Sequence, residues 1–144
     1  MSGSEVLKIV GGKIIIQKVI KVEAYGKELI IDIHNCDDSK FTRKEIRKYF
    51  RELCKLIDMK AEKLCWWDDH GLPLEFCQTE AHTKGTSAVQ FILTSNITIH
   101  TLDILKNVYI NIFSCKEFDC NLAKDFSEKW FDGKIVNSQI IKRI

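Results

Sequence analysis

The chain has 144 residues, 45% of them hydrophobic, and its 22 basic and 20 acidic side chains leave a net charge of +2. This length suits one domain around a single core, and the near balance of charge predicts no nucleic-acid partner. We find neither an apolar leader typical of secretion nor an apolar run of about 20 residues that would cross a membrane, which predicts a cytoplasmic protein without a membrane partner.

The N-terminal part reads as a polar, glycine-containing lead-in over residues 1–12, followed by a β-rich segment over 13–26. Residues 27–38 form a second strand candidate, because apolar residues alternate there and then give way to turn-forming Asn and Asp. The alternating apolar residues are Leu29, Ile31 and Ile33.

Helical spacing begins at residue 41 and continues to 59. Thr42 and Glu45 are three residues apart, as in a capping box at a helix N-terminus. Apolar residues then recur every three or four positions, namely Ile46, Tyr49 or Phe50, Leu53 and Ile57. Basic residues cover the opposite side, and we interpret that side as a solvated helix face rather than a binding surface.

Residues 61–69 are typical of a strand, and residues 70–85 form a loop that contains the only proline. Three strand-like runs with β-branched or aromatic residues follow, over 86–95, 97–101 and 108–115.

A second helix is predicted over residues 119–133, with Asp119 as its cap and Gly133 as its stop. Leu122, Phe126 and Trp130 would form its apolar stripe. A last strand candidate covers 134–144. This order favours an α+β fold, a two-layer sandwich in which two helices cover one face of a mainly antiparallel sheet.

The six cysteines do not form the closely spaced pairs that structural zinc sites use. The shortest interval separates Cys115 from Cys120, with four residues between them. We therefore expect reduced, mostly buried thiols and no metal site.

The segment 86–115 carries the most specific pattern. Ser87, Ser95, His100 and Cys115 follow one another at intervals of 8, 5 and 15 residues, and Thr101 follows the histidine. This spacing resembles that of the short prokaryotic S-adenosylmethionine decarboxylases, a family of self-cleaving proenzymes. The similarity extends from about Gly26 to the C-terminus, and residues 1–25 lie outside it. We expect the whole chain, residues 1–144, to form a single domain.

The resemblance implies a role for each of these residues. Ser95 would attack the carbonyl of Thr94, and elimination would then leave a pyruvoyl group, the cofactor of a decarboxylase in polyamine biosynthesis. His100 would be the base for that elimination, and Ser87 would hold the oxyanion. Cys115 would return a proton to the substrate carbon. We expect all four side chains to lie close together in space.

Three positions depart from the family pattern. Thr94 replaces a glutamate, Asn96 replaces a frequent histidine, and Leu102 replaces a tryptophan that would stack on adenine. Trp66, Trp67 or Phe91 are candidates for that stacking.

The substrate is therefore expected to be S-adenosylmethionine or, if the adenine pocket is lost, a smaller amino acid. A homodimer is expected, because the family builds its sites between two protomers. The alternative is a non-processing homologue that binds a small ligand or a partner. Each residue also has an ordinary structural interpretation, as an outward serine, a bonded histidine or a core cysteine.

Overall fold

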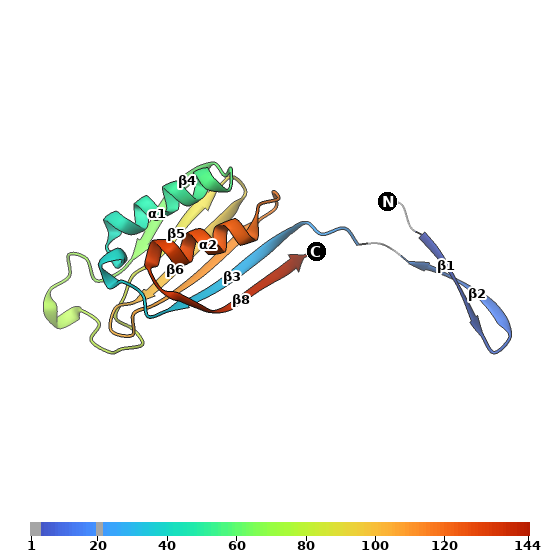
Figure 1. Ribbon diagram of the computed structural model, residues 1–144, viewed down its shortest axis with the longest axis horizontal. Coiled ribbons are helices and arrows are strands. Elements are labelled where there is room, and N and C mark those ends of the chain that lie inside the picture. Colours follow the sequence, from blue (N-terminus) through green and yellow to red (C-terminus); the bar gives the residue numbers. More distant parts are fainter. Residues whose placement is uncertain (1–3, 20–21) are drawn as a thin grey trace.

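The computed structural model describes residues 4–19 and 22–144 and has the expected α+β architecture (Figure 1). Six strands form one antiparallel sheet in the order β4-β5-β6-β7-β3-β8. Their bounds are β3 Gly26–His34, β4 Ala61–Trp67, β5 Ser87–Ile92, β6 Ser95–Leu102, β7 Asn107–Ser114 and β8 Lys134–Arg143. Two helices, α1 Arg43–Leu56 and α2 Cys120–Phe131, cover one face of this sheet.

Alternation along the strands divides the sheet into a helix-covered face and an open face. On β3, Leu29, Ile31 and Ile33 are fully buried beneath the helices, while the residues between them are partly exposed. The same alternation runs through β6 and β7. Burial of the residues on the helix-covered face stabilises the fold by roughly 1.5–3 kcal/mol per large side chain. The partly exposed residues between them form the open face.

Helix α1 begins where its capping box predicts. The Thr42 side chain accepts a hydrogen bond from the Glu45 backbone N–H at 3.2 Å, and the predicted apolar face is buried. At its centre Tyr49 is fully buried, and its hydroxyl lies 2.8 Å from the Ser127 hydroxyl of α2. This hydrogen bond joins the two helices across their contact. A short 3-10 helix, Asp38–Phe41, precedes α1, and another, Leu74–Phe76, lies in the loop after β4.

The predicted apolar stripe of α2 is correct in part, since Phe126 and Trp130 pack against the core beside Tyr49. Leu122 is 41% exposed, whereas Ala123, Ser127 and Phe131 face the core. The helix is rotated toward its smaller residues, which allow close approach to α1 and the sheet. It ends at Phe131, and the left-handed residue that terminates it is Asp132 rather than the predicted Gly133.

Residues 1–12 were expected to be a lead-in, but part of this segment is a strand. Strand β1 Ser4–Val10 pairs antiparallel with β2 Lys13–Val19. The turn between them is Gly11-Gly12, with φ of 57° and 75°, a conformation that glycine adopts without steric cost and that matches a two-residue hairpin. This hairpin is a sheet of its own.

Candidate active site

The expected cleavage site lies in the hairpin that joins β5 to β6. Ile92 pairs with Ser95 in the ladder, so Leu93 and Thr94 form a two-residue turn, where a single strand over 86–95 had been predicted. Thr94 has φ of 61°, which is uncommon for a β-branched residue and costs on the order of 1–3 kcal/mol. The bond between Thr94 and Ser95 is thus held at a tight, strained corner of the sheet.

Cys115 lies against this corner, directly after β7. Its Sγ is 3.2 Å from the Thr94 hydroxyl and accepts a hydrogen bond from the Ser95 hydroxyl at 3.8 Å. The Cys115 backbone N–H donates to Ser95 Oγ at 3.2 Å. Ser95 is only 7% exposed. The structure therefore brings the two sequence-predicted residues Ser95 and Cys115 into direct contact.

These contacts also set the acidity of the thiol. Hydrogen bonds from Thr94 and then from Ser95 hold the pKa of Cys115 below its usual 9.0. Burial has the opposite effect in the core, where it raises the pKa of Cys36 to about 12 and that of Cys54 to about 11. Cys115 is consequently better suited to proton transfer near neutral pH than these two thiols.

Ser87 and His100 form a second pair. They face each other across the β5–β6 ladder, and the Ser87 hydroxyl lies 2.6 Å from His100 Nδ1. The imidazole also stacks beside Tyr109 of β7, with ring centroids 6.5 Å apart. Both side chains project from the open face.

The expectation that all four side chains meet within one chain is wrong. Ser95 begins β6 and His100 lies five residues further along it, which corresponds to roughly 16 Å at about 3.3 Å per residue of strand. An extended strand holds its ends apart, and no side-chain rotation spans this distance. The four residues form two pairs at opposite ends of β6. We call Ser95 with Cys115 the first half-site and Ser87 with His100 the second half-site.

A cavity of about 430 Å³ opens beside the first half-site, and sequence reasoning missed its charged residues. Lys116 Nζ lies 2.5 Å from the Asp58 carboxylate, and Lys60 lines the same cavity. Lys116 follows Cys115 directly in the sequence, which was the one available signal. The position of Asp58 and Lys60 depends on how α1 leads into β4, which spacing does not reveal.

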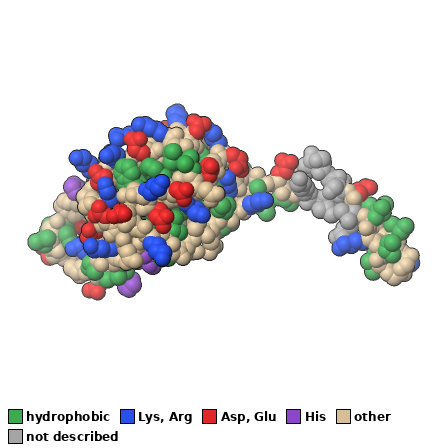
Figure 2. Space-filling model, in the orientation of Figure 1, with side chains coloured by type: hydrophobic (Ala, Val, Ile, Leu, Met, Phe, Trp, Pro, Cys, Tyr) green, Lys and Arg blue, Asp and Glu red, His purple; other side chains and the backbone are tan. Residues whose placement is uncertain are grey.

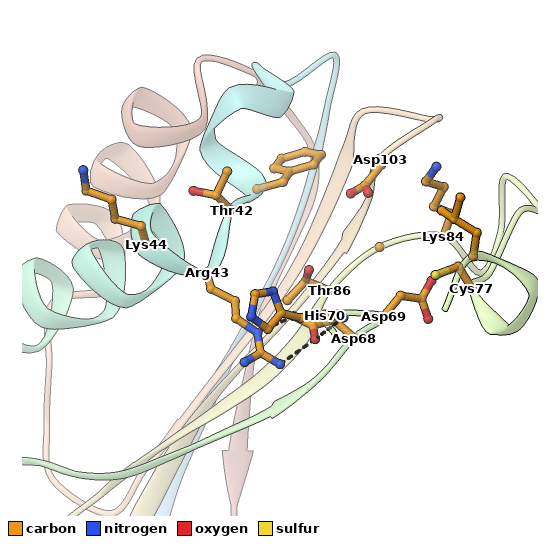
Figure 3. Close-up of a pocket in the computed structure, with 13 residues that line it drawn as sticks. Thr42, Arg43, Lys44, Asp68, Asp69, His70, Cys77, Lys84, Thr86 and Asp103 are labelled. Atoms are coloured by element: carbon orange, nitrogen blue, oxygen red, sulfur yellow. Dashed lines mark hydrogen bonds and ion pairs between the residues drawn. The ribbon is translucent and has the colours of Figure 1, made fainter. Parts of the chain in front are cut away.

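A larger cavity of about 530 Å³ lies beyond the second half-site, between the start of α1 and the loop that joins β4 to β5 (Figure 3). Arg43 donates two hydrogen bonds to Asp68, at 2.6 and 2.7 Å, and holds the pKa of that carboxyl below its usual range. Asp103 also lines the cavity, and burial raises its pKa. The Arg43–Asp68 pair fixes the loop against α1.

The structure distinguishes the candidates for stacking on an adenine ring. Leu102 is 5% exposed, so it does not present its side chain to a ligand. Trp66 lies on the helix side, where the guanidinium groups of Arg43 and Arg47 are 5.4 and 5.6 Å from its ring. Trp67 is 61% exposed and pairs with Ser87, which places it beside the second half-site.

Among the described residues, no cluster of three His, Cys, Asp or Glu side chains has the arrangement of a metal site. In the same part of the chain, neither helix is long and apolar enough to span a bilayer.

Comparison with known proteins assigns the fold to a family. Residues 27–144 match the family model of S-adenosylmethionine decarboxylase. The crystal structure of an adenosylmethionine decarboxylase from Aquifex aeolicus is similar to this chain, with a TM-score of 0.67 at 16% identity. The similarity covers 85% of this chain and 92% of the other. A sequence search among curated proteins found no match.

Proposed function

Because the chain belongs to the S-adenosylmethionine decarboxylase family, we propose that it is a self-cleaving, pyruvoyl-dependent decarboxylase that acts on S-adenosylmethionine in cytoplasmic polyamine synthesis. The observation that carries this proposal is the contact of Ser95 with Cys115 at the strained Thr94 corner. A hydroxyl adjacent to the bond that it must attack, with a thiol of lowered pKa beside it, suits both cleavage and proton transfer.

The separation of the two half-sites supports an active site that is shared between the two protomers of a homodimer. A two-fold axis perpendicular to β6 would place Ser95 and Cys115 of one protomer against Ser87 and His100 of its partner. The same axis creates a second, identical site, as an isologous interface requires. The open faces would then pack together, burying exposed apolar side chains such as Phe91, which is 44% exposed.

Cleavage would use residues of both protomers. Ser95 Oγ attacks the Thr94 carbonyl carbon, the peptide nitrogen leaves, and an ester joins the two halves of the chain. The Ser87 hydroxyl of the partner stabilises the negative oxygen of the tetrahedral intermediate. The partner's His100 removes the Ser95 α-proton, and the Thr94 carboxylate departs. Hydrolysis of the remaining dehydroalanine releases ammonia and leaves the pyruvoyl group.

The residues around Ser95 fit a pyruvoyl group, since the Ser95 side chain is nearly buried and has the Cys115 thiol, a proton donor, within 3.8 Å. That group would supply an electron sink for the electron pair left on the substrate α-carbon when the carboxylate leaves as carbon dioxide. Cys115 would deliver a proton to the substrate carbon after carbon dioxide leaves. Trp67 would provide the aromatic surface for adenine that Leu102 does not offer.

Intact mass and denaturing gels of the purified protein test the proposal. The wild-type chain should yield a fragment that ends at Thr94 and a second fragment whose first residue is a pyruvoyl group in place of Ser95. Ser95→Ala should remain a single chain and should not react with amine reagents that capture carbonyls. The His100→Ala ester should be cut by hydroxylamine. A wild-type chain that keeps its full mass for days under native conditions would refute the proposal.

That result would favour the alternative, a non-processing homologue that binds a small ligand or partner. One observation supports this second candidate. In the uncut hairpin the Thr94 hydroxyl already donates to the Leu93 carbonyl at 2.7 Å and contacts Cys115. The β-branched side chain also crowds the carbonyl that Ser95 must attack.

A further inference from the structure

The hairpin of β1 and β2, which we call the arm, carries an uncovered apolar face. Side chains from both strands gather on it through the pairs Leu7–Ile16 and Ile9–Ile14, and all four are 62–76% exposed. Figure 2 shows hydrophobic side chains concentrated on this part of the molecule. A two-stranded hairpin is at best marginally stable in water without a surface to pack on. The arm therefore needs a covering partner.

The loop over residues 68–86 has complementary chemistry. Three of its apolar side chains project into solvent, Leu72 at 48%, Leu74 at 88% and Phe76 at 65% exposure. Its sequence contains four acidic residues and one lysine, whereas residues 1–25 contain four lysines and two glutamates. Apolar contact would hold the two surfaces together, and their opposite net charges would attract the arm toward the loop.

Within one chain the arm and this loop belong to opposite ends of the sheet (Figure 1). The arm leads into β3 at Gly26, whose Cα is packed so closely on Ser114 and Cys115 that a side chain there would collide with their backbone. The arm therefore starts at the first half-site. The loop ends at Thr86, directly before Ser87, and so borders the second half-site.

The two-fold arrangement under Proposed function, on which this step rests, brings the first half-site of one protomer to the second half-site of its partner. It also brings the root of the arm to the partner's loop. Strands of seven residues extend over roughly 23 Å, enough to lie along that loop. We infer that the arm of each protomer docks its apolar face on the 68–86 loop of the other, closing the outer side of the shared site.

Photocrosslinking in the full-length protein tests this contact. Ile9 is replaced by p-benzoylphenylalanine, and the matched control places the same amino acid at Ile15, which is 50% exposed on the opposite face of the arm. Both proteins are irradiated as dimers verified by light scattering. The position 9 variant should give an interchain product whose adduct maps to residues 68–86, with at least a fivefold higher yield than position 15.

The mass of the product separates this inference from the proposed function, since both the arm and the loop precede Thr94. A doubled 1–94 fragment supports both. A doubled full-length chain with the same adduct supports the docking and refutes self-cleavage. Crosslinks within one chain, adducts elsewhere or equal yields at both positions refute the docking while cleavage still stands. A monomeric protein refutes the shared site and the docking together.

Discussion

The proposed division of the active site between two protomers predicts complementation between two inactive variants. His100→Ala removes the base from one half-site, and Cys115→Ala removes the proton donor from the other. Each homodimer then lacks the same group in both sites, and we expect a loss of turnover of about 10²-fold or more. A heterodimer of the two variants has one site with both changes and one site with neither.

The expected recovery of turnover follows from the number of complete sites in the heterodimer. Heterodimers isolated through two different affinity tags should have about half of the wild-type turnover per dimer, because one of two equivalent sites is complete. The structure also predicts which chain is cut. The chain that carries His100→Ala keeps its own Ser95 and Cys115 beside the partner's intact His100, so its Thr94–Ser95 bond should break. The Cys115→Ala chain should remain whole.

The assay is decarboxylation by release of labelled carbon dioxide, together with intact mass of each tagged chain. Doubly tagged dimers in which both chains carry His100→Ala are the control, and they should show neither turnover nor a pyruvoyl terminus. Cleavage of the Cys115→Ala chain instead would mean that His100 serves its own protomer. The separation of roughly 16 Å along β6, from about 3.3 Å per residue, would then have to be bridged by a rearrangement, and our reasoning would be wrong.

Three further outcomes are expected. In the uncut Ser95→Ala chain, alkylation of Cys115 should reach half its maximal rate below pH 9.0. Thr94→Val should raise the pH of this midpoint, since the Thr94 hydroxyl is the first cause of the lowered Cys115 pKa. The rates are measured by mass spectrometry, and an unchanged midpoint would contradict the hydrogen bond between Thr94 and Cys115. Ser127→Ala should lower the free energy of unfolding by about 1–3 kcal/mol, because the buried Tyr49 hydroxyl loses its partner. Tyr49→Phe should cost about 1 kcal/mol, because the remaining Ser127 hydroxyl keeps its hydrogen bond to the Ala123 carbonyl at 2.7 Å. Urea unfolding compares the two variants, and a larger loss for Tyr49→Phe would argue against the Tyr49–Ser127 hydrogen bond. Trp67→Ala should raise KM for S-adenosylmethionine about tenfold, corresponding to about 1.4 kcal/mol of lost stacking, while Trp67→Phe keeps most of the affinity; equal KM values in all three proteins would place adenine elsewhere.

The sequence predicted the layers of this fold because its signals are local. Alternation at Leu29, Ile31 and Ile33 and the capping box at Thr42 depend on neighbouring residues, and both appear in the structure as predicted. The orientation of α2 was not predictable in the same way. Phe126 and Trp130 pack on Tyr49 as their spacing predicts. The exposure of Leu122 and the burial of Ala123 and Ser127 depend instead on how closely α2 approaches α1 and the sheet.

The candidate site shows the same limit at a larger scale. Spacing identified Ser87, Ser95, His100 and Cys115 and the structure places them in two contacting pairs. Spacing could not reveal that the pairs are a strand length apart, because that depends on the turn at Leu93 and Thr94. The N-terminal strand β1 was not predicted for a different reason, since a polar, glycine-containing segment such as residues 1–12 is typical of irregular chain as well as of a strand that leads into a tight hairpin turn.

The strand order has a consequence for a chain cut at Thr94. The piece before the cut contributes β3, β4 and β5, and the piece after it contributes β6, β7 and β8, yet β3 lies between β7 and β8. The strands of the two pieces therefore alternate at this edge of the sheet, and three ladders join the pieces, β3–β7, β3–β8 and β5–β6. They should stay together as one fold while it is intact. Once unfolded, however, they must find each other by diffusion, so heating a mature, dilute enzyme should inactivate it irreversibly, whereas the uncut Ser95→Ala chain should refold.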